Sequence, residues 1–310
     1  MKVAVTGAMG HIGSHLIRDH RFTTMTKEIK LLDNFSTQRY NSWYSLPERP
    51  KYTLIEGDVR EQLQSCILED CDVVIHLAAN TQSSTSVTQP EIIERNLDLT
   101  KHVASCCHMT NTPLIFISST SVYGSHDGLV NERTRVKPPK LPYAISKLAE
   151  EDLLLELADK GMQVTILRLG TIFGVSPGMQ FHTAVSKFCW EASTRSSITV
   201  WSTALDQIRP YLHVYDAAGA ICRVLALEDD HVPKLLNVVG ANATVREILD
   251  FIRSSVGPIQ VNVEQHPAMA TTSFVVDSQL SEEYGIHITK SLEDGIRETL
   301  EYLSGLQFAR

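Results

Sequence analysis

The pair Tyr143 and Lys147 is the first feature of the sequence whose residue types and spacing could do chemistry. Residues four apart lie on one face of a helix, and residues 142–160 have a helical pattern, with a proline at the start, a glycine just after the end and a stripe of leucines. A phenol is a poor base at neutral pH, since its reference pKa is about 10. A neighbouring ammonium, the helix dipole and a bound nicotinium cation would each stabilise the phenolate. Tyr143 is therefore a candidate base for a substrate hydroxyl.

A serine cluster at residues 118–121 follows directly on the apolar stretch 114–117. A continuous apolar run of this length is typical of a strand that is covered on both faces. Ligands of open α/β sheets bind at the carboxyl ends of the strands, which is where this cluster would lie. Ser119 could then contact the reacting hydroxyl and relay its proton to Tyr143. A Tyr–Lys pair alone is common on helix surfaces, so this assignment depends on the rest of the chain.

Three glycines spaced three apart, Gly7, Gly10 and Gly13, separate a short β-branched strand from a helical pattern. Side chains at these positions would block a tight turn, or would hold the backbone away from a pyrophosphate that backbone amides bind. Asp33 follows the last glycine by 20 residues, at the end of the second predicted strand. A carboxylate there accepts hydrogen bonds from ribose hydroxyls and repels a 2′-phosphate. The spacing therefore predicts a dinucleotide site that prefers NAD to NADP.

The composition limits the classes of protein to which the chain can belong. Its 28 Lys and Arg against 36 Asp and Glu give a net charge of −8, so there is no excess positive charge for nucleic acid or an acidic membrane surface. No apolar run approaches the roughly 20 residues of a membrane-spanning helix, and the glycine turn comes too early for a secretion signal. None of the six cysteines has the spacing of a zinc site. We therefore expect a cytoplasmic protein with reduced thiols, no metal, and no nucleic-acid or membrane partner.

Strand-like and helix-like patterns alternate over the first half of the chain. We predict strands near residues 3–5, 29–32, 52–55, 73–77, 114–117 and 164–169, and helices near 91–109 and 142–160. This alternation predicts an α/β fold, a doubly wound parallel sheet of Rossmann type with helices on both faces. Asp58 and Val59 end the third strand, where they either flank the adenine of a dinucleotide or are ordinary strand-end residues.

The pattern changes after residue 172, where Pro177 and Gly178 interrupt it. We therefore predict an NAD-binding domain over residues 1–172 and a smaller, mainly substrate-binding domain over residues 173–310. Strand-like segments near residues 211–214 and 235–239 are expected to rejoin the main sheet, so the boundary is not a single cut. Thr244 and Glu247 have the spacing of a capping box, and a terminal helix is expected near residues 291–303.

Together these motifs resemble the nucleotide-sugar epimerase/dehydratase branch of the extended short-chain dehydrogenase/reductase family, which includes UDP-galactose 4-epimerase. The resemblance covers nearly the whole chain. It rests on the glycine turn at residues 6–13, Leu-Asp-Asn at 32–34, Gly-Asp-Val at 57–59 and His-Leu-Ala-Ala at 76–79. It continues through the serine cluster, Pro-Tyr-Ala-Ile-Ser-Lys at 142–147, Leu-Arg at 167–168 and Arg-Pro-Tyr-Leu-His-Val-Tyr-Asp at 209–216.

The resemblance implies a role for each matching position. Tyr143 would be the catalytic base, Lys147 would hold the nicotinamide ribose, and Ser119 would contact the reacting sugar hydroxyl. The NAD site would consist of Gly7, Gly10, His11, Ile12, Gly13, Asp33, Asn34, Asp58, Val59, Leu77, Ala78 and Ala79, together with Tyr143 and Lys147. The nucleotide sugar would contact Ser119, Thr120, Thr171 and Arg209. Arg209 would face the diphosphate, or it would form an ordinary ion pair.

Three departures from the family pattern bear on the reaction. Related 4,6-dehydratases carry acidic residues where this chain has Thr120 and Ser121, and neither hydroxyl can remove water unaided, which disfavours elimination. Thr171 stands where the family usually has an asparagine that contacts the diphosphate. His182 and Trp201 lie in the stretch where substrate-binding residues are normally found, and the sequence assigns them no role.

The leading hypothesis is an NAD-dependent epimerase that acts at C4 of a UDP-hexose, by transient oxidation to a 4-keto sugar with tightly held NAD. The second is an NAD(P)H-dependent reductase of a keto-sugar or another carbonyl. The third, of a different class, is a non-catalytic protein that senses a dinucleotide. The resemblance also implies a homodimer joined through the helices near residues 91–109 and 142–160.

Overall fold

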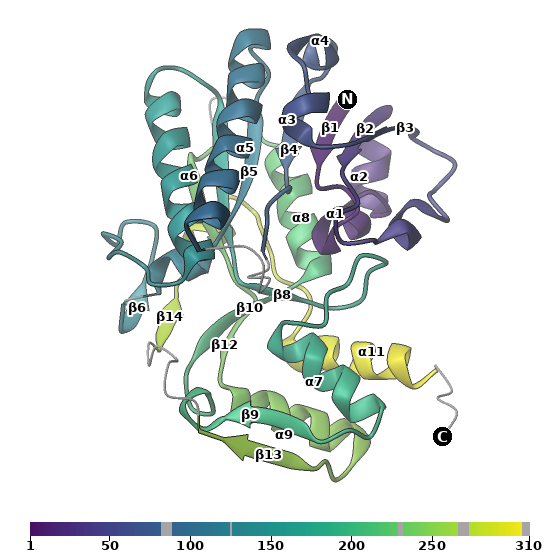
Figure 1. The fold of residues 1–310 in the computed structure, drawn as a ribbon, viewed down its shortest axis with the longest axis vertical. Helices are drawn as coiled ribbons and strands as arrows, with labels where there is room; N and C mark the ends of the chain where they lie inside the picture. Colours follow the sequence, from purple (N-terminus) through teal and green to yellow (C-terminus); the bar gives the residue numbers. More distant parts are fainter. Residues whose placement is uncertain (82–88, 125, 229–231, 266–272, 306–310) are drawn as a thin grey trace.

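A seven-stranded parallel sheet forms the centre of the N-terminal half of the molecule (Figure 1). The computed structural model describes residues 1–81, 89–124, 126–228, 232–265 and 273–305. The strands of the sheet lie in the order β11-β7-β5-β4-β1-β2-β3, and every neighbouring pair is parallel. Their bounds are β1 Lys2–Thr6, β2 Glu28–Asp33, β3 Lys51–Glu56, β4 Val73–His76, β5 Leu114–Ser119, β7 Val164–Leu169 and β11 Leu235–Val238. The predicted α/β fold with a doubly wound parallel sheet is confirmed.

The central strands are apolar on both sides, which explains their continuous apolar runs in the sequence. In β1, Val3 and Val5 belong to one hydrophobic core, whereas Ala4 belongs to another on the opposite face. In β5, Ile115 and Phe116 divide between the same two cores. Because successive side chains of a strand point to opposite faces, such a strand must be covered on both sides.

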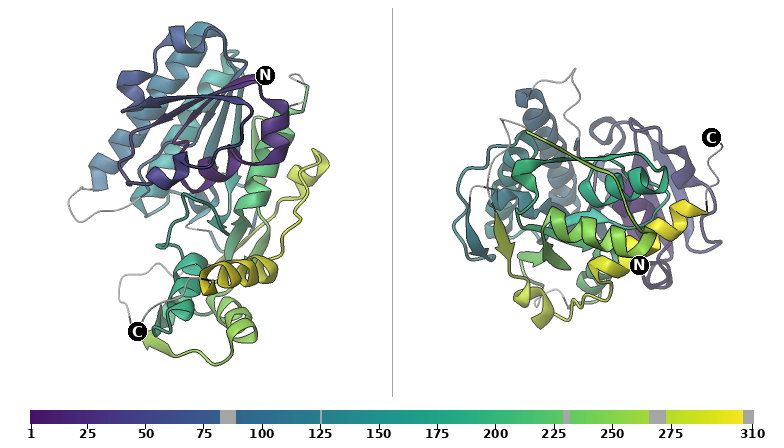
Figure 2. Two further views of the ribbon diagram at one scale, coloured as in Figure 1. Left: turned by 90° about the vertical axis from the view of Figure 1, so that its right-hand side faces the viewer. Right: turned by 90° about the horizontal axis from the view of Figure 1, so that it is seen from below.

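Two layers of helices cover these faces, and Figure 2 shows the sheet between them. The first layer contains α5 (Gln89–Thr110), α6 (Pro142–Asp159) and the short helices α3 (Val59–Gln62) and α4 (Ser65–Leu68). The second contains α1 (His11–Leu16), α2 (His20–Met25) and α8 (Val214–Leu225). The chain leaves β1 toward β2 and β3 and returns to β4 on the other side of β1. This reversal opens a crevice at the carboxyl ends of the strands.

Most of the remaining chain lies below the main sheet in Figure 1, around a third hydrophobic core. Its helices are α7 (Ala184–Ser193), α9 (Val245–Val256) and α11 (Leu292–Ser304), which pack on one another. Its strands are β8 (Thr171–Phe173), β9 (Ile198–Trp201), β10 (Arg209–His213), β12 (Ala241–Ala243) and β13 (Val261–Glu264). Outside this core, α10 (Gln279–Glu283) packs on β11, and β14 (Phe274–Val276) pairs with β6 (Gly128–Val130). The predicted capping box of Thr244 and Glu247 begins α9. Among the described residues, no helix is both long and apolar enough to cross a membrane.

The two later strands that were expected to rejoin the main sheet go to different sheets. β11 lies at the edge of the main sheet beside β7, as predicted. The strand expected near residues 211–214 is β10, and that expectation is wrong, because β10 pairs with β8 and β12 in a separate three-stranded sheet. The edge of β7 that faces away from β5 is already occupied by β11, so no edge is left there for β10. The domain boundary at residue 172 stays a prediction.

A buried ion pair joins α6 to the main sheet. Glu151 is fully buried, and its carboxylate accepts hydrogen bonds from Arg168 Nε at 3.0 and 3.1 Å and from Arg168 Nη2 at 2.5 Å. The hydroxyl of Ser118 donates to the same carboxylate, and Arg168 Nη1 donates to the hydroxyl of Tyr123 at 2.6 Å. Because α6 carries Tyr143 and β5 carries Ser119, this network fixes the two catalytic candidates relative to each other.

We expect Arg168→Met to lower the free energy of unfolding by about 3–5 kcal/mol, because it leaves the Glu151 carboxylate buried without its counter-charge. Urea unfolding of the variant and the unaltered protein measures the difference. The double variant Arg168→Met with Glu151→Leu should recover most of the loss, since it removes both charges. A loss below about 1 kcal/mol in the single variant would contradict this account of the ion pair.

Candidate active site

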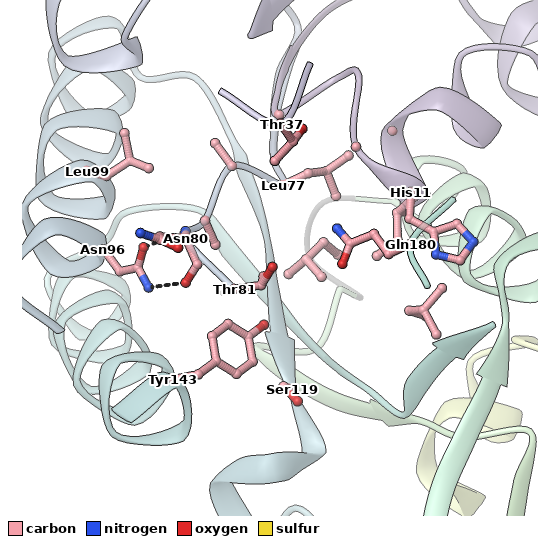
Figure 3. Close-up of a pocket in the computed structure, with 18 of the residues that line it drawn as sticks. His11, Thr37, Leu77, Asn80, Thr81, Asn96, Leu99, Ser119, Tyr143 and Gln180 are labelled. Atoms are coloured by element: carbon pink, nitrogen blue, oxygen red, sulfur yellow. Dashed lines mark hydrogen bonds between the residues drawn. The ribbon is translucent and has the colours of Figure 1, made fainter. Parts of the chain in front are cut away.

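A cleft of about 720 Å³ opens at the carboxyl ends of β1, β2, β4 and β5. Its walls come from the glycine turn, from the segments that follow these strands, from α5 and α6, and from residues 169–172 and 180–183. The predicted site residues that line it are Gly7, Gly10, His11, Ile12, Gly13, Asp33, Asn34, Asp58, Val59, Leu77, Ala78, Ala79, Ser119, Tyr143, Lys147 and Thr171. Figure 3 shows Tyr143 and Ser119 in one region of this cleft and His11 in another. Residues from many separate segments are thus brought into one cavity.

The glycine turn passes too close to its neighbours for side chains to fit. Gly7 has a φ of 68°, and a Cβ on it would lie 2.6 Å from the amide nitrogen of Ala78. A Cβ on Gly13 would lie 2.6 Å from the carbonyl oxygen of Ala8. No side chain caps α1 at Gly10, so the turn presents bare backbone to the cleft. This cradle fits the pyrophosphate of a dinucleotide, whose charge backbone amides can meet.

Asp33 and Asp58 both line the cleft but have different local partners. Asp33 Oδ2 accepts from the backbone amide of Met9 at 2.9 Å, and Oδ1 accepts from the amide of Phe35 at 2.9 Å. Asp33 therefore braces the glycine turn and keeps free lone pairs toward the cleft. Asp58 caps α3 and forms an ion pair with Arg60 at 2.7 Å. Hydrogen bonds from Arg60 hold the pKa of Asp58 below its usual value.

A loop from the C-terminal half covers the outer side of the glycine turn. A Cβ on Gly178 would lie 2.4 Å from the carbonyl oxygen of Gly10, so the two backbones are in direct contact. The amide of Gly178 donates to Ser14 Oγ at 2.8 Å, and His11 Nε2 is 2.8 Å from the carbonyl oxygen of Gly174. Burial lowers the pKa of His11 to about 4, which makes it a neutral hydrogen-bonding group at neutral pH. The two halves of the molecule are therefore joined directly behind the predicted pyrophosphate site.

Tyr143, Lys147 and Ser119 lie on two elements that face the cleft. Tyr143 is in the first turn of α6, just after the proline at the start of the helix. Lys147 is one turn further along, with Nζ 5.9 Å from the centroid of the Tyr143 ring, and it is almost fully buried. Ser119 ends β5, where its Oγ accepts a hydrogen bond from the amide of Ser121 at 3.1 Å. The Ser119 hydroxyl hydrogen is thus free to point at a substrate.

The electrostatics around Tyr143 combine opposing contributions. Burial and the carboxylate of Glu150 raise the pKa of Tyr143, whereas the ammonium of Lys147 lowers it, as expected from the sequence. The net effect is a pKa above the ordinary value of the phenol, with burial as the largest cause. A positive charge added to the cleft would lower this pKa.

Three residues singled out in the sequence lie away from the lining of the cleft. Thr120 is buried, and its hydroxyl donates to the carbonyl oxygen of Leu169 at 3.2 Å. Arg209 donates to Gln207 at 2.9 Å and is not among the residues that line the cleft in the described part of the chain. Trp201 ends β9, in the C-terminal half. The substrate contacts of Thr120 and Arg209 stay predictions.

A buried asparagine that the sequence analysis missed organises the wall of the cleft. Asn96 of α5 accepts from the amide of Asn80 at 2.8 Å and donates to the carbonyl oxygen of Asn80 at 3.1 Å (Figure 3). Its side chain also donates to Ser146 Oγ at 3.1 Å, and Ser146 donates to the carbonyl oxygen of Tyr143 at 3.0 Å. Asn96 therefore links the segment after β4 to the turn of α6 that carries Tyr143. Residues 91–109 contain many other polar side chains, so nothing in the sequence distinguished Asn96 from the solvated ones.

Three side chains that the sequence did not connect with one another span the cleft, from the N-terminal half of the molecule to the C-terminal half. Arg39 follows β2, and Gln180 and His182 come from the C-terminal half; all three line the cleft. With its amide oxygen turned toward Arg39, Gln180 accepts from Nη2 and Nη1 at 2.8 and 3.0 Å, and its nitrogen lies 3.0 Å from the ring nitrogens of His182. Burial and the nearby guanidinium lower the pKa of His182. The sequence left His182 without a role, and the structure places it in the wall of the cleft.

The donor set of the cleft fits a dinucleotide better than a metal ion. The bare glycine turn, the strand-end carboxylate of Asp33 and the Lys147 ammonium would hold the pyrophosphate, the adenosine ribose and the nicotinamide ribose of NAD, respectively. Among the described residues, no group of three or more His, Cys, Asp or Glu side chains is placed to hold a metal.

Comparisons with known proteins agree with this arrangement. A model of the NAD dependent epimerase/dehydratase family matches residues 3–239. The chain is 27% identical over 326 residues to an uncharacterized UDP-glucose epimerase of Bacillus subtilis, with 99% of both chains covered. It is 27% identical over 288 residues to the UDP-glucose 4-epimerase of Azospirillum brasilense, covering 86% of this chain and 79% of that one.

Solved structures share the fold over almost the full length. The UDP-glucuronic acid 4-epimerase of Bacillus cereus superposes with a TM-score of 0.88 at 24% identity, covering 99% of this chain and 100% of that one. MoeE5, solved in complex with UDP-glucose and NAD, superposes with a TM-score of 0.83 at 26% identity, covering 97% and 98% of the two chains. Since the family model spans most of the chain and the cleft fits the cofactor, the protein is an enzyme of the NAD-dependent epimerase/dehydratase family.

Proposed function

We propose that the protein is a nucleotide-sugar epimerase that inverts C4 of a UDP-hexose through a 4-keto sugar. The observation that carries the proposal is the position of Tyr143 and Ser119 in one cavity (Figure 3). Lys147 Nζ lies 5.9 Å from the centroid of the Tyr143 ring, and the glycine turn lines the same cleft. A phenol beside an ammonium can take up and return a proton, which is what reversible oxidation of an alcohol requires.

In this reaction, residues of the protein would orient the sugar hydroxyl, remove its proton and later return that proton. Ser119 orients the C4 hydroxyl, and Tyr143 takes the hydroxyl proton as the carbon–oxygen single bond becomes a double bond. NAD bound in the cleft would supply the acceptor and the donor of the C4 hydride. After the keto-sugar has turned over in the cleft, so that the opposite face of C4 is presented, Tyr143 gives the proton back to the carbonyl oxygen. The proton and the hydride are both restored, so the net reaction is redox-neutral.

Hydroxyl groups on the cleft wall support a sugar as the substrate. The described lining contains the hydroxyl-bearing residues Thr81, Ser119, Ser121, Thr171 and Thr183, and also Asn80. Sugars present many hydroxyls, and such a wall can donate to them and accept from them. The names of the related UDP-glucose epimerases support a UDP-linked hexose.

Elimination of water has weaker support than epimerisation at this site. Thr120 is buried against a backbone carbonyl, and Ser121 lines the cleft with a hydroxyl that has no protein partner. Neither group ionises near neutral pH, so neither can remove a carbon-bound proton unaided. We therefore place epimerisation ahead of dehydration.

A proton NMR time course with a panel of UDP-hexoses and a catalytic trace of NAD tests the proposal. We expect an epimer to appear without net formation of NADH. Stoichiometric consumption of NADH with a keto-sugar would instead identify a reductase. NAD binding without any change in the sugars or in added keto-sugars would favour a non-catalytic dinucleotide sensor.

The variant Tyr143→Phe should lower kcat by at least about 100-fold, because it removes the group that moves the proton. Its Kd for NAD, measured by fluorescence titration, should change by less than about threefold, since the ring and the glycine turn remain. Tyr52→Phe is the matched control, because the Tyr52 hydroxyl donates to the carbonyl oxygen of Ile17, away from the cleft. Unchanged turnover in Tyr143→Phe would exclude the mechanism.

The variant Asp33→Asn should weaken NAD binding by about tenfold or more, because a neutral amide is a poorer acceptor for ribose hydroxyls than a carboxylate. Binding of NADP should weaken less or improve, since the repulsion of its 2′-phosphate is lost. Calorimetric titration with each dinucleotide gives the ratio of the two Kd values. Asp58→Asn is the control for a second strand-end carboxylate, and an equal shift of the ratio in both variants would contradict the role of Asp33.

A further inference from the structure

Lys147 has a buried counter-ion on its own helix. Glu150 follows it by three residues and is fully buried, and its Oε2 accepts a hydrogen bond from Lys147 Nζ at 3.0 Å. The same oxygen accepts from Thr100 Oγ1 of α5 at 3.0 Å, whereas Oε1 has no hydrogen-bond partner among the residues that the structure describes. A lysine and a glutamate three apart usually form a weak surface pair, but both of these side chains are almost completely removed from water.

The carboxylate of Glu150 can only accept hydrogen bonds, so it determines which group is the donor at each step of a longer hydrogen-bond chain. Thr100 donates its proton to Glu150, so Thr100 Oγ1 must accept from His76 Nε2, which lies 3.2 Å away. His76 Nδ1 is then an acceptor for the hydroxyl of Thr6 at 2.6 Å, and that hydroxyl oxygen accepts from the amide of Ala78 at 3.3 Å. Burial lowers the pKa of His76 to about 3, so the ring is neutral, as this direction requires. The chain connects the end of β1, beside the glycine turn, to the catalytic face of α6.

Other groups around the ammonium do not duplicate the role of Glu150. From α6, Tyr143 presents its ring, and the charge of Glu151 is already paired with Arg168 of β7. From β4 comes neutral His76, from α5 the hydroxyl of Thr100, and from β5 the ring of Phe116, whose centroid is 4.3 Å from Nζ. Within the described residues, the carboxylate in contact with Lys147 is that of Glu150.

The pairing of Lys147 with Glu150 changes the effect of Lys147 on the pKa of Tyr143. Burial by itself lowers the pKa of Lys147, but Glu150 and then Tyr143 outweigh it, and the net pKa lies above the ordinary value. The ammonium is therefore charged at neutral pH, and the carboxylate 3.0 Å away opposes its effect on Tyr143. Lys147 consequently stabilises the phenolate of Tyr143 less than an unpaired ammonium would.

We propose that Glu150 is a positioning residue that anchors the Lys147 ammonium and opposes its stabilisation of the phenolate, so that Tyr143 depends on the positive charge of the oxidised nicotinamide to lose its proton. The proposal rests on the proposed function, in which Tyr143 alternates between base and acid. While the cofactor is reduced, Tyr143 keeps the proton it has taken from the sugar. That proton is then available for the carbonyl oxygen when the hydride returns.

Glu150→Gln tests the proposal, because the amide keeps a hydrogen-bond acceptor for Lys147 and Thr100 but removes the negative charge. The phenolate of Tyr143 is then stabilised by an uncompensated ammonium. The acidic limb of the kcat–pH profile should move to lower pH by roughly one unit. The tyrosinate absorbance of the NAD-loaded protein, with Tyr143→Phe as the blank, should show the same shift. If the acidic limb of the kcat–pH profile and the tyrosinate titration of Glu150→Gln both stay where they are in the unaltered protein, the proposal is overturned.

Two matched variants separate charge from packing. Glu156→Gln removes a carboxylate of the same helix that is exposed and paired with Lys160, so neither the profile nor the titration should move. Thr100→Val removes one anchor of Glu150 but keeps its charge, so the limb should stay in place. A shift of similar size in Glu156→Gln would show a general effect of helix charge and would contradict the proposal.

A measurement on the unaltered protein covers the case in which Glu150→Gln does not fold. The tyrosinate titration is run with NAD and with NADH bound, and the pKa of Tyr143 should be at least one unit lower with NAD. Equal values would overturn the proposal. Neither titration needs a sugar to turn over, so both can be interpreted even where the NMR time course shows that the protein is not an epimerase.

Discussion

The positive charge of Lys147, buried between α6 and the sheet, is the constraint on which the rest of the site depends. A buried ammonium is tolerated only when it is paired and hydrogen-bonded, and Glu150 meets that requirement, while Thr100 of α5 donates to the same carboxylate. The same helix buries a second charge, Glu151, which Arg168 pairs from β7. The Glu151–Arg168 pair thus holds α6 against the strands, and the Lys147–Glu150 pair within the helix connects it to α5 through Thr100.

The two walls of the cleft come from different parts of the chain. The glycine turn, the strand ends and α6 all belong to the N-terminal sheet and its helices, which present the cofactor site and the proton-transfer group. Thr171, Gln180, His182 and Thr183 come from chain beyond β7 and form the opposite wall. Catalytic residues on strands and helices are held more precisely than residues on loops.

Local spacing allowed the sheet, the glycine turn, Asp33 and the Tyr143–Lys147 pair to be predicted, because each motif lies within one or two adjacent elements. The edge on which β10 pairs could not be predicted, since an apolar strand pattern does not state which neighbour is available. Asn96 and Gln180 were missed because their partners lie far away along the chain. The pairing of Lys147 with Glu150 is visible as a three-residue spacing, but the sequence does not distinguish a buried pair from a solvated one. Homodimerisation stays a prediction.

The contact of Gly178 with the carbonyl oxygen of Gly10 has a thermodynamic consequence. The cleft exists only while both halves are folded and this contact holds them together, so a ligand of the cleft binds the native state and not the unfolded chain. By mass action, the ligand then adds RT ln(1 + [L]/Kd) to the free energy of unfolding, about 2.7 kcal/mol at a concentration of 100 Kd. The cellular pool of the dinucleotide would therefore set the lifetime of the enzyme as well as its activity.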